Sequence, residues 1–178
     1  MKQLLSRRHR NLFAAALLLL PTAVPKTGKP APKSTPASDG KFDIRLLVTD
    51  EPDRVLHPTK AADGSYPQAQ PITIAQRGRL LVGFVFFKDC KADAQGNCNA
   101  DVDVQGLVPG GAFFKNQKGA DLWRNRKAPH AGFVQLGAPN IKIQIEAKDP
   151  AGTYRLIAVA HDHNSGAESR AEASFEVK

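Results

Sequence analysis

The chain has 178 residues, with 25 Lys and Arg against 17 Asp and Glu, which gives a formal net charge of +8 at pH 7. Hydrophobic residues make up 42% of it, enough for a packed core, so a wholly disordered chain is excluded. Two cysteines are too few for a disulfide-built scaffold or a Cys/His structural zinc site. The length predicts one domain with an appendage.

Most of the positive charge precedes the first periodic segment. Residues 1–40 carry a net charge of +6, and residues 41–178 carry only +2. A nucleic-acid-binding domain needs its positive charge on the folded surface, because neutralising phosphates supplies most of its affinity. The charge distribution therefore argues against nucleic acid as a partner.

Residues 1–23 are a predicted export signal. A basic opening is followed by the apolar run Leu12–Leu20, which ends at Pro21. Even when the run is extended to Val24, a helix would span only about 20 Å, whereas the bilayer core is about 30 Å thick. We therefore expect no stable transmembrane span and a periplasmic or secreted location, with a membrane tether only if the signal is not removed.

Residues 24–40 are a predicted linker. Five prolines lie between Pro21 and Gly40, interleaved with Lys, Ser, Thr and Gly, and large apolar residues are almost absent. Such a segment buries too little surface to offset the entropy lost on ordering. We expect a disordered, semi-extended spacer between the signal and a domain of residues 41–178.

From Phe42 onward, apolar and polar residues alternate with a period of two. The predicted strands are Phe42–Val48, Arg79–Phe87, Val102–Val104, Gly132–Leu136, Ile141–Glu146, Thr153–Ala160 and Ala173–Val177. Arg79–Phe87 is apolar at both parities, which predicts a central strand covered on both faces. Turn clusters separate the strands at intervals of about 8–12 residues. The pattern predicts an all-β fold, an antiparallel β-sandwich of about seven to nine strands.

The segment Asp149–Asp162 resembles the penultimate strand of an immunoglobulin-like domain. Gly152 stands two residues before Tyr154 at the start of this strand, which is similar to a tyrosine corner, where the phenol bonds back to the backbone. The resemblance is to the immunoglobulin-like β-sandwich domains of exported bacterial envelope proteins. It implies an architecture and leaves the activity open.

Cys90 and Cys98 flank a turn directly after the most apolar strand. In an exported protein, two cysteines this close predict a disulfide across the mouth of a hairpin. Closing a loop of about nine residues stabilises a fold by roughly 2–3 kcal/mol. A redox-active pair is the alternative, but such pairs more often have Cys-x-x-Cys spacing.

His161 and His163 are the sharpest polar feature of the sequence. Residues i and i+2 of a strand project from one face, so both imidazoles would reach one copper or zinc ion, with His57 or His130 completing the ligand set. The alternative interpretation is a solvated strand end before a turn. The aspartates around the disulfide loop lack the spacing of an EF-type calcium loop.

Aromatic and basic side chains also gather in the less regular middle of the sequence. Binding hot spots favour aromatic and arginine side chains that lie together. This composition predicts an interaction surface made of Phe113, Phe114, Trp123, Arg124 and Arg126. The alternative is that Trp123 is a core or loop-anchoring residue surrounded by solvated basic side chains.

The sequence contains no Gly-x-Ser-x-Gly, no His-Glu-x-x-His and no phosphate-binding glycine loop, so we expect no enzyme and no cofactor. The favoured function is a non-catalytic exported module that binds a protein partner, or has an accessory role, in the bacterial cell envelope. A periplasmic copper- or zinc-binding protein that uses His161 and His163 is the alternative.

Overall fold

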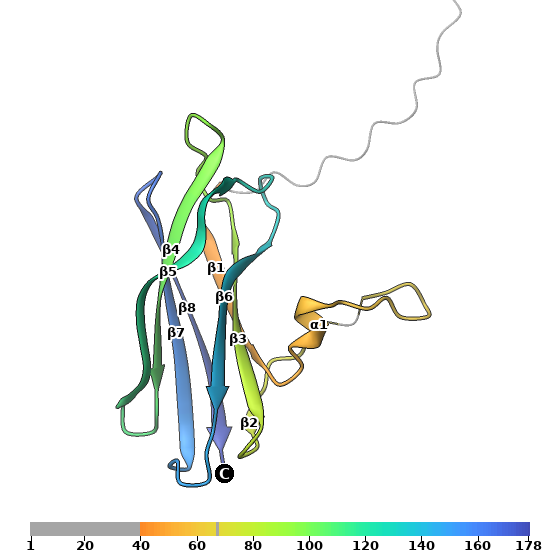
Figure 1. The fold of residues 1–178 in the computed structure, drawn as a ribbon, viewed down its shortest axis with the longest axis vertical. Helices are drawn as coiled ribbons and strands as arrows, with labels where there is room; N and C mark the ends of the chain where they lie inside the picture. Colours follow the sequence, from red (N-terminus) through yellow and green to blue (C-terminus); the bar gives the residue numbers. More distant parts are fainter. Residues whose placement is uncertain (1–39, 67) are drawn as a thin grey trace, which may run out of the picture. The chain divides into compact units, whose positions relative to one another are not determined.

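The computed structural model describes residues 40–66 and 68–178. These residues form two β-sheets and one short helix (Figure 1). The predicted export signal, and the predicted linker apart from Gly40, lie outside the described residues. Within the described part of the chain, no helix has the length and apolar character needed to cross a membrane.

Eight strands lie in the described residues and divide between the two sheets. In chain order the elements are β1 (Asp43–Thr49), α1 (Asp53–Leu56), β2 (Ile74–Ala75), β3 (Leu80–Lys88), β4 (Asn97–Leu107), β5 (Phe113–Lys127), β6 (Gln135–Gln144), β7 (Gly152–Asp162) and β8 (Ala167–Val177). The smaller sheet has the order β1-β3-β6 and the larger the order β2-β8-β7-β4-β5. Neighbours are antiparallel except β2 and β8, which are parallel. The predicted all-β, two-sheet architecture is confirmed.

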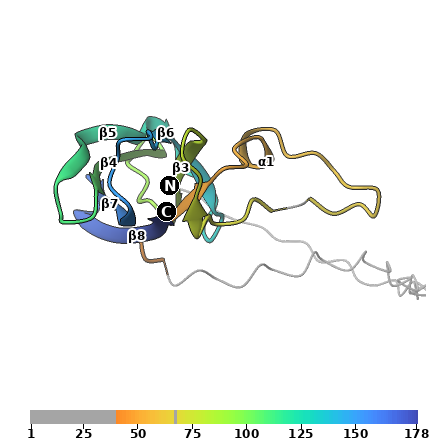
Figure 2. The ribbon, with the colours of Figure 1, turned by 90° about the horizontal axis from the view of Figure 1, so that it is seen from below.

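The core lies between the two sheets, which Figure 2 shows end-on as two layers. From the three-stranded sheet, β3 contributes Leu81 and Val85, which are both fully buried. From the five-stranded sheet, β4 contributes Val102 and β7 contributes Leu156, which are also fully buried. Each such side chain stabilises the fold by about 1.5–3 kcal/mol. The predicted period of two thus reflects one face of each strand turned toward the core.

Strand β3 is also buried on its outer face, as its unbroken apolar sequence predicted. Val82 is 5% exposed and Phe84 is 0% exposed, and both alternate with the inward-facing residues of the strand. Phe84 lies opposite Leu47 of β1 in the ladder. The outer side of this sheet is therefore partly covered.

Residues 50–66 and 68–73, which we call the arm, lie between the end of β1 and β2. The arm lies on the outer side of the three-stranded sheet and projects away from it (Figures 1 and 2). It contains α1, which begins after Pro52, a residue whose fixed φ suits a helix start. The sequence predicted no regular element here, because four helical residues are too few to show a period.

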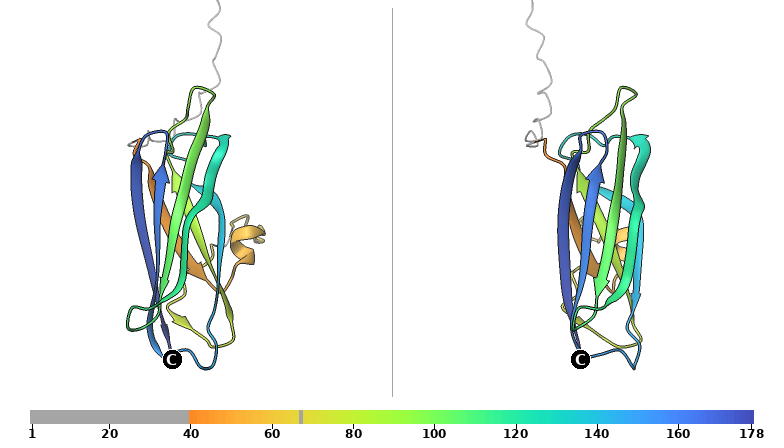
Figure 3. Two further views of the ribbon diagram at one scale, coloured as in Figure 1. Left: turned by 60° about the vertical axis from the view of Figure 1, so that its left-hand side comes forward. Right: turned by 90° about the vertical axis from the view of Figure 1, so that its left-hand side faces the viewer.

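Strand β5 was not predicted, although it is 15 residues long. It runs beside β4 (Figure 3), but the ladder between them shifts register at four places. Each shift moves the following side chains to the other face of the sheet and interrupts the alternation. The strand is therefore continuous, but its pattern of apolar and polar residues is irregular.

Tyr154 forms the corner that the sequence predicted. Its hydroxyl donates to the Pro150 carbonyl at 2.9 Å, and its ring stacks on Phe175 with the centroids 5.6 Å apart. Burial raises the pKa of Tyr154, the charge of Asp149 adds to this, and Arg77 opposes it. The phenol therefore stays protonated and keeps its hydrogen bond to Pro150, in the turn before β7.

Candidate functional site

The five residues of the predicted interaction surface fall into two groups along β5. Phe113 and Phe114 begin the strand, whereas Trp123, Arg124 and Arg126 lie near its other end. Ten residues of extended chain separate positions 113 and 123 by roughly 30 Å. These residues do not form one patch.

Trp123 anchors its end of β5. Its ring packs on Phe87 with the centroids 5.5 Å apart, and its Nε1 donates to the Lys127 carbonyl at 2.9 Å. The Arg126 guanidinium lies over the ring, 5.0 Å from its centroid, and also bonds Asp121 at 2.7 Å. These contacts support the anchoring interpretation of Trp123, and its role in binding stays a prediction.

At the other end of β5, the two phenylalanines differ. The Phe114 ring lies over Gly106 and leaves no room for a side chain there, and it packs on Tyr154 with the centroids 5.9 Å apart. Phe113 is 56% exposed. Phe114 therefore contributes to packing, while Phe113 is an isolated apolar side chain.

His161 and His163 each have a separate carboxylate partner. His161 Nδ1 lies 3.4 Å from Glu168, and His163 Nε2 lies 2.9 Å from Asp101. Burial of Asp101 favours its neutral form, but hydrogen bonds from His163 and Arg124 outweigh this and lower its pKa. The described residues contain no group of three or more His, Cys, Asp or Glu side chains placed to hold a metal ion. The geometry gives the predicted copper or zinc site no support.

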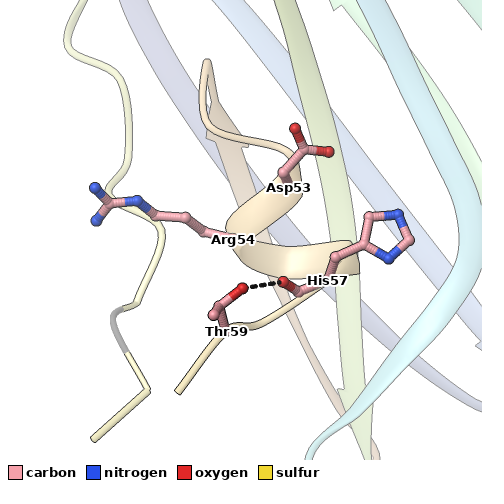
Figure 4. A pocket seen from close by; sticks show the side chains of 4 residues that line it. All are labelled: Asp53, Arg54, His57 and Thr59. Carbon is pink, nitrogen blue, oxygen red and sulfur yellow. Dashed lines mark hydrogen bonds between the residues drawn. The ribbon is translucent and has the colours of Figure 1, made fainter. Parts of the chain in front are cut away.

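The two histidines predicted to complete that site lie on other elements. His130 is in the loop between β5 and β6, and His57 follows α1 in the arm. A shallow pocket is lined by His57 together with Asp53, Arg54 and Thr59. Figure 4 shows these four side chains pointing in different directions, with a hydrogen bond from Thr59 Oγ1 to the His57 carbonyl. A binding site needs convergent groups, so this pocket does not form one.

Cys90 and Cys98 are joined in the structure, with their Cα atoms 5.9 Å apart. The predicted disulfide pairing is confirmed. The bond closes the connection between β3 and β4, and Cys98 is itself a fully buried member of the core.

Asp162 is the residue that the sequence analysis missed in this region. It is 1% exposed, and its Oδ2 accepts from the Lys91 N–H at 2.9 Å and the Ser165 hydroxyl at 2.6 Å. The neighbouring Asn164 amide donates to the carbonyls of Lys91 and Asn97. This network ties the turn after β7 to the disulfide loop. The available signal was the parity of Asp162, which matches the buried face of β7.

A groove of about 710 Å³ lies between the arm and the outer face of the three-stranded sheet. Its polar lining groups, among the described residues, are the side chains of Arg54 and Gln68 and the hydroxyl of Tyr66, and its apolar side chains include Phe86. Two aromatic side chains in it are strongly exposed, Tyr66 at 54% and Phe133 at 60%. A concave, mostly apolar surface with a few polar groups is the usual form of a ligand site, and exposed apolar clusters mark interaction surfaces. The groove is therefore the candidate functional site.

Phe133 reaches the groove because its strand begins later than the sequence predicted. The expected strand was Gly132–Leu136, but β6 begins at Gln135. The Phe133 N–H donates to the His130 carbonyl at 2.9 Å, and Asp89 accepts from the Gly132 N–H at 2.7 Å. These bonds hold residues 130–133 as a loop, so the Phe133 ring is not placed in the core.

The two sheets, their largely antiparallel ladders and the core between them define a β-sandwich. No protein family and no curated protein sequence matches the chain. Among solved structures, the chain is similar to part of a family 123 glycoside hydrolase from Clostridium perfringens, with a TM-score of 0.42 and 11% sequence identity. The similarity covers 76% of this chain and 27% of that chain, so this chain spans about a quarter of the hydrolase.

Proposed function

We propose that the protein is a non-catalytic, exported binding module of the bacterial cell envelope, built on an immunoglobulin-like sandwich. The groove beside the arm is its binding site, and the bound partner is a protein. The observation that carries this proposal is the pair of exposed aromatic rings, Tyr66 and Phe133, in one concave surface. Buried aromatic anchors supply much of the affinity of protein interfaces.

The composition of the groove favours binding over catalysis. Among its described lining residues there is no Ser, Cys, His, Asp or Glu, the side chains that most often act as nucleophiles or general acids and bases. The described lining residues offer apolar surface, one amide, one guanidinium and the phenol hydroxyl of Tyr66. These groups hold a ligand by burial and hydrogen bonding.

Two features support the exported, immunoglobulin-like part of the proposal. Tyr154 makes the backbone hydrogen bond of a tyrosine corner. Cys90 and Cys98 form a disulfide pair, and such bonds persist in oxidising compartments. The disulfide agrees with the export signal that the basic and apolar opening of the sequence predicts.

The test compares two exposed phenylalanines by affinity capture from a bacterial envelope fraction. Phe133→Ala removes a ring from the groove, and Phe113→Ala removes a ring of similar exposure from β5, outside it. We expect Phe133→Ala to lose the captured partner and Phe113→Ala to retain it. Equal capture by both variants, or no partner for the unmodified chain, contradicts the proposal.

A further inference from the structure

We infer that the groove recognises an extended acidic peptide segment of its partner, one with an apolar anchor side chain close to an Asp or Glu. This inference rests on the proposed function and names the chemistry of the partner. It is carried by the placement of aromatic and cationic side chains on the outer face of the three-stranded sheet.

The floor of the groove is the outer face of β3 around Phe86. In the ladder, Phe86 lies opposite Arg45 of β1 on one side and Leu136 of β6 on the other. Phe86 is only partly buried, unlike the fully covered Phe84 two residues earlier. The uncovered stretch of the sheet thus begins at Phe86 and leaves apolar surface for an anchor side chain.

The walls come from two separate segments. One wall consists of the arm residues Val55, Pro58 and Tyr66. The other consists of Phe133 and Val134, which precede β6. An aliphatic or aromatic side chain that enters between them removes the exposed rings from water, at about 25 cal/mol per Å² of apolar area. An open groove along a sheet face suits an extended backbone, whose alternate side chains point toward and away from the sheet.

Cationic side chains surround this apolar floor. Arg54 lines the groove itself, and a hollow that adjoins it at Phe86 and Val134 is lined by Arg45, Lys88 and Asp43. Among the described residues, the two hollows are lined by three cations and one carboxylate, and Lys88 also lies 3.8 Å from Asp89.

Arg45 is the cation that the fold leaves available. It is exposed, and among the described residues it forms no ion pair, whereas Arg54 lies 3.1 Å from Glu51. A guanidinium beside an apolar floor favours a carboxylate, because it binds both oxygens in a fixed geometry. An acidic side chain next to the anchor would meet Arg45.

The same chemistry disfavours two other occupants. A sugar presents many hydroxyls that need partners, and only Arg54, Tyr66 and Gln68 among the described lining residues carry polar side-chain groups. The chain's own linker carries Lys26, Lys29 and Lys33, which have the same sign of charge as the cations of the groove. A foreign acidic segment is complementary to the site, and the linker is not.

The test selects a phage-displayed library of random 12-residue peptides on the purified full chain, then measures the enriched peptides by fluorescence polarisation. We expect the enriched sequences to share an aromatic or aliphatic residue close to Asp or Glu. Binding should weaken at least about tenfold in Phe133→Ala and about fivefold in Arg45→Glu. Lys118→Glu makes the same charge change on β5 and should leave binding unchanged.

The inference is overturned if the enriched peptides lack acidic residues, or if Arg45→Glu and Lys118→Glu weaken binding equally. It is also overturned if no peptide is enriched while phosphatidylglycerol vesicles bind through Phe133. An envelope partner that is captured through Phe133 but binds by a non-acidic segment overturns this inference alone. If no envelope partner is captured, or if its capture does not depend on Phe133, the proposed function is overturned as well.

Discussion

The two sheets present outer faces of opposite character. On the five-stranded sheet, Glu172 joins two arginines, because it lies 2.8 Å from Arg170 and 3.6 Å from Arg155. On the three-stranded sheet, Phe86 is only partly covered, and Arg45 has no ion pair among the described residues. One face carries an ion-pair network between neighbouring strands, and the other carries a partly exposed aromatic ring beside an arginine that forms no ion pair among the described residues.

Under the proposed function, this difference separates a solvated surface from a binding surface. Exposed ion pairs stabilise a fold by only about 0–1 kcal/mol each, so the charged face contributes chiefly to solubility. Exposed aromatic side chains in a concave surface lower the free energy only when they are covered.

Phe84→Ala and Phe133→Ala contrast a covered and an uncovered ring near the same sheet. Phe84 is 0% exposed, so its removal should lower the free energy of unfolding by about 3–5 kcal/mol. Phe133 is 60% exposed, so its removal should change that free energy by less than about 0.5 kcal/mol. Urea denaturation measures both changes. Similar losses would show that Phe133 is a structural residue and would break the comparison.

Asp162→Ala tests the buried network beside the disulfide loop. The substitution leaves the Lys91 N–H and the Ser165 hydroxyl without their acceptor, and we expect a loss of about 2–4 kcal/mol in the free energy of unfolding. Asp63→Ala removes an exposed carboxylate from the arm and should cost less than about 0.5 kcal/mol. Equal effects would mean that the network does not stabilise the loop.

Replacing both Cys90 and Cys98 with Ser removes the constraint on the β3–β4 connection. Removing the cross-link that closes this loop of about nine residues should lower the free energy of unfolding by about 2–3 kcal/mol. The groove does not include either cysteine among its described lining residues, so peptide affinity should be retained. If the variant folds but binds the peptide more weakly, the disulfide loop contributes to the groove.

The pH dependence of stability tests Asp101 on the five-stranded sheet. The hydrogen bonds from His163 and Arg124 outweigh the effect of burial and lower the pKa of Asp101. The stability it contributes is therefore fully present above its unfolded pKa, near pH 4, and is lost as the pH falls through the lower folded value. Asp101→Asn should show a shallower fall in melting temperature between about pH 4 and pH 2, with a cost at neutral pH below about 1 kcal/mol. Identical pH profiles would contradict the assignment.

Part of the fold and little of the candidate site could be predicted from the sequence. The unbroken apolar run of β3, the alternation in β7 and the spacing of Gly152 and Tyr154 are local patterns, and all three were interpreted correctly. β5 was missed because its register shifts break the alternation. Phe133 was placed in a strand because its neighbours alternate, whereas hydrogen bonds to the loop decide where β6 begins.

The sequence by itself determined that strands form and that their apolar faces pair in two layers, because a period of two follows from the geometry of each strand alone. The tertiary structure decided which apolar residues stay uncovered. Tyr66, Phe86 and Phe133 come from three segments separated by at least 20 positions, and no local pattern relates them. Their shared groove exists because the arm lies on the outer side of the sheet, and exposure is set by what packs against a side chain.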